Sequence, residues 1–337
     1  MNETDTTSRG RTWRVGDTTH VLGGDPWLMG ILNVTPDSFS DGGEFISLEA
    51  AVDRARVMVD SGAAMIDVGG ESTRPGAEPV GTAEELRRVI PVIEAVAAEV
   101  KVPVSIDTMK ADVARAAVEA GASVVNDVSG LEADPEMVAT GGGLDVAGVC
   151  MHMRGTPQTM QDDPVYQDVV EDVASYLENR LDHLVSAGLP AERVAFDPGI
   201  GFGKTATHNL QLLSSIDRLH RSDRPVLIGH SRKRFLSKLL GRPVEERTAG
   251  TIGVAVAWPD RGSRSSGFTT WQRFTTPLWP GGSLTRQPGE RDVDGYSSRG
   301  GRIISELVAS AACLSSNSTL NTSAVIGISM PRCSANS

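Results

Sequence analysis

Polar side chains end several short apolar runs of this sequence, and three of them could recognise a ligand together. Asp107, Asn126 and Asp197 end the runs VSID, VVND and AFD. Two carboxylates and an amide that meet at one place can hydrogen-bond the edge of a flat, nitrogen-rich ring. Each residue alone could instead cap the helix that follows, the commoner role for an Asp after a strand. Their number favours a polar pocket for a heterocycle.

The stretch MGILNVTPDSFSDGG, residues 29–43, begins with an apolar run, and the nine residues that follow this run include six polar side chains. A connecting loop does not need so many, whereas a site for a charged, oxygen-rich ligand does. Asn33 stands where the run opens, and its amide oxygen can bind Mg2+, which completes its shell with water and phosphate oxygens. The alternative is an Asn that only caps the turn, and the nearby Asp37 and Asp41 weigh against it.

Two further segments offer cations to an anion. DVGGESTRPGAEPV, residues 67–80, supplies the hydroxyl of Thr73 and the planar guanidinium of Arg74. GHSRKRF, residues 229–235, places Lys233 for an anion or a ring carbonyl, and Arg232 for a carboxylate or phosphate. A plain surface loop and a solvated basic turn are the respective alternatives.

The segments DPGIGFGK and CMHMRG are less decisive. The first lacks the Walker and GxGxxG patterns, so Gly201 more plausibly allows a ligand to approach closely while Phe202 packs beside its ring. In the second, Cys150 and His152 share one face of a strand, where a Cys–His nucleophile would be poorly arranged. Met151 points the other way, and core packing explains this segment more simply.

The elements that must position these residues alternate regularly up to about residue 258. Expected buried strands are 28–34, 65–68, 102–106, 123–128, 146–151, 194–196 and 225–228. Segments of helical period lie between them, at 48–61, 83–98, 110–120, 165–187, 209–219 and 244–258. This alternation predicts a parallel sheet covered by helices. Polar residues at seven strand ends favour a (β/α)8 barrel, because a doubly wound sheet would concentrate its site at one or two switch points.

Composition narrows the class of protein. The chain has 337 residues, 39% hydrophobic and 22% charged, with a net charge of −11. That charge argues against non-specific nucleic-acid binding, which takes clustered Lys and Arg, and leaves room for an anionic small molecule. Three cysteines form no spaced framework, and no run approaches the length of a membrane span or a secretory signal. We therefore expect a cytoplasmic protein without a membrane partner.

The chain divides into three unlike parts: an N-terminal segment 1–19, a barrel domain 20–258, and an atypical tail 259–337. The last 79 residues contain no Lys and no His, and Gly, Ser, Pro and Thr dominate them. Only seven strand–helix units can be counted before this tail. We therefore expect the eighth unit of the barrel to be missing or replaced by an irregular, low-complexity segment.

Taken together, these motifs closely resemble dihydropteroate synthase. MGILNVTPDSFSDGG and DVGGESTRPGA are similar to the two signature segments of that family, and SIDT, VVNDVSG, MHMRGTPQTMQ, DPGIGFGK and GHSRKRF follow in the family's order. The resemblance covers about residues 20–258. It implies a (β/α)8 barrel that joins 6-hydroxymethyl-7,8-dihydropterin diphosphate to p-aminobenzoate, giving dihydropteroate and diphosphate for folate synthesis.

The resemblance also implies roles for single residues. Asn33 would hold Mg2+, and Phe39 would lie in a loop that closes over the diphosphate. Asp107, Asp197 and Lys233 would serve the reaction itself. The remaining substrate contacts implied are Thr73, Arg74, Asn126, Met151, Gly201, Phe202, Ser231 and Arg232. Small molecules are the expected partners, and family members commonly form homodimers.

The tail departs from the family. The family's eighth strand carries Arg-Val-His-Asp-Val, whose Arg and His bind the diphosphate end, but this chain has no His after His230. Suppose that residues 266–272 are encoded TCC-GGG-TTC-ACG-ACG-TGG-CAG. Read from the third base, the same string encodes Arg-Val-His-Asp-Val-Ala. We hypothesise a frameshift between Trp258 and Ser266.

Two other functions compete with an active synthase. A pterin-barrel methyltransferase that uses methyltetrahydrofolate is less favoured, because it needs neither the SFSDGG loop nor the ESTRPG segment. The frameshift supports the second, a degenerate product that binds pterin weakly or not at all.

Overall fold

The computed structural model describes residues 11–22, 26–34, 48–73, 76–143, 145–160, 164–257 and 270–274. Its strands are β1 Arg11–Val15, β2 Thr18–Leu22, β3 Leu28–Asn33, β4 Ala63–Gly69, β5 Val104–Asp107, β6 Val124–Asp127, β7 Ala147–Met151, β8 Val194–Asp197, β9 Val226–Ile228 and β10 Thr270–Phe274. Its α-helices are α1 Leu48–Asp60, α2 Thr82–Glu99, α3 Ala111–Glu119, α4 Met137–Gly143, α5 Val169–Ser186, α6 Ala206–Ser214, α7 Arg234–Leu240 and α8 Thr248–Ala257. Short 3-10 turns are η2 Ala191–Arg193, η3 Ile216–His220 and η4 Val244–Glu246.

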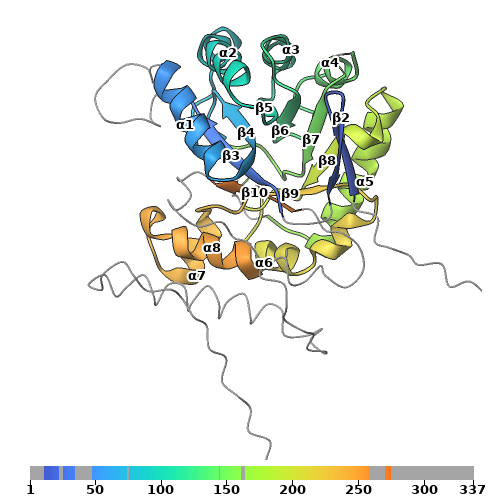
Figure 1. Ribbon diagram of the computed structural model, residues 1–337. Coiled ribbons are helices and arrows are strands. Elements are labelled where there is room, and N and C mark those ends of the chain that lie inside the picture. Colours follow the sequence, from blue (N-terminus) through green and yellow to red (C-terminus); the bar gives the residue numbers. More distant parts are fainter. Residues whose placement is uncertain are drawn as a thin grey trace, which may run out of the picture.

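The strands β3 to β9 form one parallel sheet in chain order, and β10 joins its two edges into a closed barrel. Figure 1 shows the helices arranged around these strands. Each of β3 to β9 is followed by helix before the next strand begins, because a parallel neighbour can be reached only by a crossover. The barrel predicted from the alternation of strands and helices is therefore confirmed.

The eighth strand position differs from our expectation. We expected no strand there, yet β10 pairs in parallel with β9, Trp271 opposite Leu227, and with β3, Arg273 opposite Met29. The segment TWQRF is rich in the β-branched and aromatic residues that favour strands. Pairing of β10 satisfies backbone groups that an open barrel would leave exposed on β3 and β9. No α-helix after β10 lies within the described part of the chain.

Side chains of the strands alternate between two apolar layers. Ile66 of β4 and Val125 of β6 point outward, into a layer packed against the helices. Met65 of β4 and Val124 of β6 point into the barrel, where they pack with Met29. Because successive side chains on a strand face opposite ways, this parity fixes which polar residues near the strand ends lie inside the barrel.

The hairpin β1–β2 closes the N-terminal end of the barrel. Trp13 and Leu22 are fully buried and belong to the same apolar cluster as the inward-facing residues of the strands. The indole nitrogen of Trp13 donates to the carbonyl of Arg193 at 2.9 Å. The domain boundary expected at residue 20 therefore falls inside β2, and the hairpin is part of the barrel domain.

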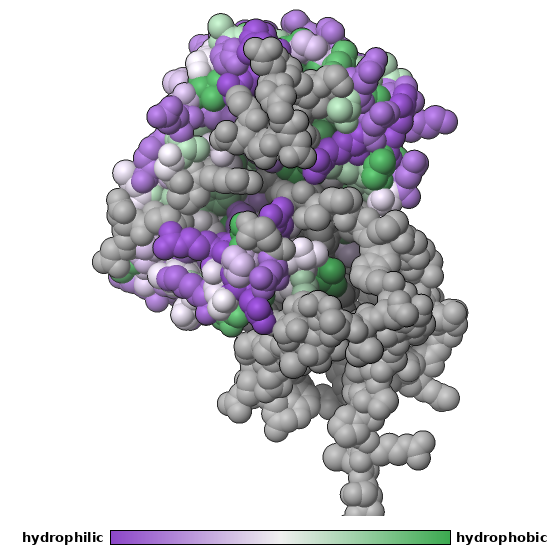
Figure 2. Space-filling model, turned by 90° about the vertical axis from the view of Figure 1, so that its left-hand side faces the viewer, coloured by the Kyte–Doolittle hydropathy of each residue, from purple (hydrophilic) through white to green (hydrophobic). Residues whose placement is uncertain are grey.

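One face of the molecule shows how hydrophobic and hydrophilic residues are distributed on its surface. Figure 2 shows hydrophobic residues scattered among hydrophilic ones on the side that carries α1. Among the described residues, no helix combines the length and the apolar character that crossing a membrane requires.

Candidate active site

Four residues form a continuous row across the carboxyl ends of β3 to β6. Asn33 pairs with Gly69, Gly69 with Asp107, and Asp107 with Asn126. Residues paired in a parallel sheet point to the same face, and these have the parity of the barrel interior. A Cβ atom on Gly69 would lie 3.3 Å from Asn33 Oδ1 and 3.9 Å from Asp107 Oδ2. The absence of a side chain at Gly69 thus leaves an oxygen-lined space between Asn33 and Asp107.

The orientation of Asn126 is set by a residue that sequence analysis did not single out. Asn126 is 2% exposed, and its Nδ2 donates to both oxygens of Asp67, at 3.3 and 3.2 Å. Asp67 is 1% exposed and lies on β4, one inward-facing position below Gly69. The amide oxygen of Asn126 is therefore left for another donor. A carboxylate inside an otherwise apolar run, MIDVG, was the sequence signal for this role.

Asp197 ends β8 and is held by its own loop. It is 3% exposed and accepts a hydrogen bond from the backbone nitrogen of Gly199 at 2.7 Å. Gly199 has a φ of 66°, and a Cβ there would lie 1.9 Å from the carbonyl oxygen of His152. Only glycine therefore fits this turn, which brings the ends of β7 and β8 together.

A buried lysine fastens the same turn. Lys204 Nζ lies 2.9 Å from His152 Nδ1 and donates to the carbonyls of Phe202 and His152, at 3.0 and 3.3 Å. Burial lowers the pKa of Lys204 well below its ordinary value. Burial, with the charge of Lys204, also lowers the pKa of His152 to about 2. His152 is therefore neutral at physiological pH and accepts from Lys204 rather than acting on a substrate.

An apolar wall completes one side of the mouth. Met151 and Phe202, both predicted substrate contacts, pack there with Val128 and Met160. The ammonium nitrogen of Lys233 stands 4.0 Å from the centroid of the Phe202 ring, a cation–π geometry. Such a wall suits a flat ring, because it packs against the ring face while polar groups reach its edge.

Lys233 reaches this wall because Gly201 has no side chain. Its ammonium group donates to the carbonyl of Ile200. A Cβ on Gly201, whose φ is 83°, would stand 2.8 Å from Lys233 Cδ. The fold therefore brings together Gly201 and Lys233, two predicted substrate contacts that lie more than thirty residues apart in the sequence.

The structure places Arg232 differently from its neighbours. Its φ is 57°, its backbone nitrogen donates to Thr251 Oγ1 at 3.0 Å, and its Nε donates to the carbonyl of Val244 at 3.3 Å. These contacts direct the guanidinium toward η4, so Arg232 braces the loop after β9. Ser231, half-buried, precedes it in the same turn.

The structure describes only some of the remaining residues that the sequence analysis singled out. Thr73 is half-buried in the segment after β4. Arg74 and Phe39 lie outside the described residues. Cys150 is fully buried on the outer face of β7, and burial raises the pKa of its thiol. The interpretation of Cys150 as a packing residue agrees with this environment.

Asn33 is the residue that the sequence analysis predicted as a metal ligand. Among the described residues, no group of three or more His, Cys, Asp or Glu side chains is arranged to hold an ion. Asn33 Oδ1 faces the oxygen-lined space beside Gly69. An amide and a carboxylate oxygen suit Mg2+, which usually takes only one or two protein ligands.

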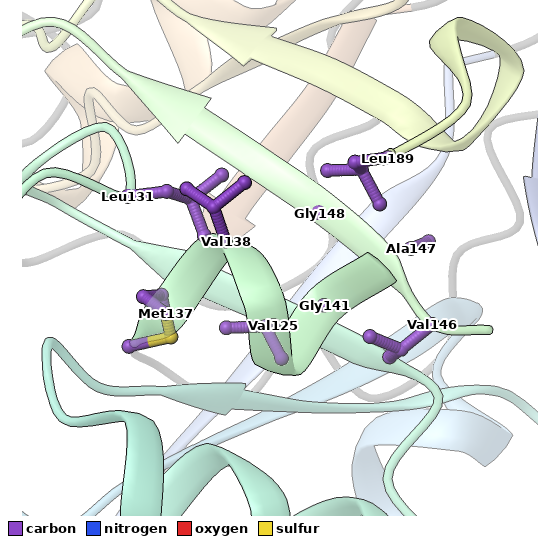
Figure 3. A pocket seen from close by; sticks show the side chains of 9 residues that line it. All are labelled: Val125, Leu131, Met137, Val138, Gly141, Val146, Ala147, Gly148 and Leu189. Atoms are coloured by element: carbon purple, nitrogen blue, oxygen red, sulfur yellow. The ribbon is translucent and has the colours of Figure 1, made fainter. Parts of the chain in front are cut away.

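A small apolar pocket lies elsewhere, between α4 and the strands β6 and β7 (Figure 3). Its walls include Val125, Met137 and Leu189, and no polar side chain faces it. It cannot supply hydrogen bonds to a heterocycle, so the barrel mouth remains the candidate active site.

Fold and site together define a barrel enzyme that binds a flat, polar ring at its carboxyl end. The model of the pterin binding enzyme family matches residues 29–265. A dihydropteroate synthase of Synechocystis is 47% identical over 238 residues, which cover 70% of this chain and 82% of the relative. The chain belongs to the dihydropteroate synthase family of pterin binding enzymes.

Solved structures of dihydropteroate synthases are similar to this chain in fold and in sequence. Dihydropteroate synthase of Xanthomonas albilineans with 4-aminobenzoic acid has a TM-score of 0.71 and 42% identity, covering 78% of this chain and 92% of that one. The Burkholderia cenocepacia enzyme, complexed with 7,8-dihydropteroate, has a TM-score of 0.69 and 38% identity, with coverage of 79% and 92%.

Proposed function

We propose that this chain condenses 6-hydroxymethyl-7,8-dihydropterin diphosphate with p-aminobenzoate, releasing 7,8-dihydropteroate and diphosphate. The observation that carries the proposal is the row of inward-facing polar groups at the barrel mouth, beside the wall of Met151 and Phe202. The names of the relatives, and the ligands of the solved enzymes, support the same reaction.

The polar groups match the donor-rich edge of a pterin. Asp107 and Asp197 accept hydrogen bonds, and Asn126 presents its oxygen because its nitrogen is committed to Asp67. The wall packs against the ring face, and Lys233, beside Phe202, offers a donor to a ring heteroatom or to the second substrate. We assign Thr73 and Arg74 to the diphosphate and aminobenzoate side.

The chemistry follows from this arrangement. As the bond from carbon to diphosphate oxygen breaks, positive charge spreads into the pterin, where the carboxylates of Asp107 and Asp197 stabilise it. The neutral amine of p-aminobenzoate then forms the new carbon–nitrogen bond and loses a proton. Mg2+, held by Asn33, would take up charge on the departing diphosphate. No strong base is required, which suits a site whose histidine, His152, is locked as an acceptor.

The experiment is a direct assay. The purified full-length chain is incubated with pterin diphosphate, p-aminobenzoate and Mg2+, and dihydropteroate is detected by mass spectrometry. The Asp107→Ala variant should make none, because it loses the carboxylate that accepts from the ring. Equal product from both proteins contradicts the assigned site, and no product from either contradicts the proposed function.

We further propose that the tail limits this activity. The chain lacks the His that the family's eighth strand carries, and β10 provides a strand without it.

We also propose a cytoplasmic location and a homodimer. The absence of a cysteine framework supports the first, and Ile252, 47% exposed on the apolar helix α8, supports the second.

A further inference from the structure

Lys110 connects the two loops that follow β4 and β5. It is the N-cap residue of α3, three residues beyond Asp107, and its ammonium group forms ion pairs with Glu71 and Glu85. Glu71 lies just after β4, whereas Glu85 lies in the first turn of α2. One cation thus ties the ends of two neighbouring strands to the helix that connects them.

The segment after β4 is also fixed by α2 directly. Arg88 Nη1 donates to the carbonyl of Gly70 at 2.9 Å. A Cβ on Gly70 would lie 2.6 Å from Val89 Cγ1 and 3.0 Å from Glu85 Cγ, so the helix packs against the bare backbone. Gly70 therefore cannot shift without losing contacts to α2, and Glu71, the next residue, is held by Lys110.

The charges of this cluster depend on one another. The Glu85 side chain has no exposed surface, that of Glu71 is 13% exposed, and that of Lys110 is 24% exposed. Burial acts to lower the pKa of Lys110, but hydrogen bonds and charges from both carboxylates outweigh it and raise that pKa. Lys110 therefore stays protonated, and a buried carboxylate deprived of it would be strongly disfavoured.

Most ion pairs among the described residues differ from this cluster. Asp112 and Arg115, for example, pair at 2.9 Å within α3, with side chains 72% and 44% exposed. Such pairs contribute little, because water screens them. The Lys110 cluster instead joins residues 25 and 39 positions apart along the chain, at the edge of the candidate active site.

We propose that Lys110 is a positioning residue for the second substrate: by holding Glu71 against α2, it sets the approach of Thr73 to the barrel mouth. The inference rests on the proposed function, in which Thr73 serves the diphosphate and aminobenzoate side. The pterin ring binds at Asp107, Asn126 and Asp197, whereas Glu71 pairs with Lys110. Loss of the cluster should thus weaken the use of p-aminobenzoate while leaving binding of the pterin unchanged.

The deciding variant is Glu71→Ala, because it frees the loop while leaving Lys110 paired with the buried Glu85. Its KM for p-aminobenzoate should rise about tenfold or more, as expected when a positioning contact is lost. Binding of 6-hydroxymethylpterin, measured by calorimetry, should not change. Hydrogen–deuterium exchange at the backbone amides of residues 70–73 should become faster. Lys110→Arg, which keeps the charge, should retain most of the wild-type behaviour.

Asp112→Ala is the matched control, since it removes an exposed carboxylate from the first turn of α3 and should change none of these quantities. Unchanged KM and unchanged amide exchange in Glu71→Ala overturn the inference. An equal loss of pterin binding also overturns it, because that indicates general disruption. If the wild-type chain makes no product, the proposed function fails, and amide exchange of residues 70–73 together with pterin binding still decides the role of Lys110.

Discussion

Asn126 donates its side-chain nitrogen to both carboxylate oxygens of Asp67, two strands away inside the barrel. An amide has one donor end and one acceptor end, so this contact decides which end faces the mouth. Recognition by Asn126 is therefore set by a residue that lies below the site.

Replacing Asp67 should weaken pterin binding without removing any direct ligand contact. Asp67→Ala leaves the buried Asn126 nitrogen without its acceptor, a loss of about 1–3 kcal/mol, or roughly 5- to 150-fold in Kd. Asp67→Asn, which keeps one acceptor oxygen, should lose less. Calorimetry with 6-hydroxymethylpterin measures both.

Ser105→Ala is the control for this prediction. Ser105 lies beside Asp67 on β5, buried, and its hydroxyl has no hydrogen-bond partner among the described residues. Its replacement should leave pterin affinity unchanged. Similar losses of pterin affinity in the Ser105 and Asp67 variants would show that general packing inside the barrel, rather than the contact of Asp67 with Asn126, determines the affinity.

Stability should depend on pH through Asp127. Burial raises the pKa of this carboxyl from 3.8 to about 6. Between about pH 4 and 6 the unfolded chain loses this proton while the folded chain keeps it. The free energy of unfolding therefore falls as pH rises through this window, by up to about 3 kcal/mol.

Asp127→Asn removes this dependence and keeps an oxygen for the backbone nitrogen of Ser129, which now donates to Asp127 Oδ1 at 2.7 Å. Urea unfolding at several pH values should show the variant gaining stability over wild type from pH 4 to 6, with a constant difference above. A difference that does not vary with pH contradicts the assignment.

The metal requirement should depend on Asn33. Turnover should need Mg2+, and Asn33→Ala should raise the Mg2+ concentration needed for half-maximal rate. Binding of 6-hydroxymethylpterin should stay intact, because Asn33 offers its oxygen to the metal rather than to the ring. Full activity in excess chelator is the result that rules this out.

Restoring the family's eighth strand should raise the rate. A one-base correction that gives Arg-Val-His-Asp-Val supplies the His that this chain lacks there. We expect the chain as written to turn over far more slowly than the corrected one at saturating substrates, and to be less stable. Equal rates and equal unfolding midpoints would mean that the frameshift hypothesis is wrong.

Strand positions were predictable because apolar runs are an unambiguous signal of buried strands. The run 28–34 became β3, and 146–151 became β7, each within one residue. The start of α5 came four residues later than predicted, because Asp168 accepts from the backbone nitrogens of Val170 and Glu171 and so caps the helix there. The predicted helix 209–219 divides instead at Ser215.

Other elements gave weaker signals. The segment that forms α4, MVATGGG, has poor helix propensity and forms a helix through tertiary packing. The hairpin β1–β2 turns at Gly16 and Asp17, a short turn signal that strand alternation on either side could have revealed. Asp67 was missed because sequence alone does not say which amide a buried carboxylate will meet. Gly201 and Lys233 were singled out from residue type, but their contact could be seen only in the fold.

The hairpin carrying Trp13 closes one end of the barrel, which leaves the mouth at the carboxyl ends of the strands. Anything that reaches the deep polar row must pass the rim where Thr73 and Lys233 stand, and must leave by the same way. A molecule at the rim therefore blocks one below it. With the proposed site, we therefore expect the pterin to bind first and the aminobenzoate second, and the product to leave before another pterin binds.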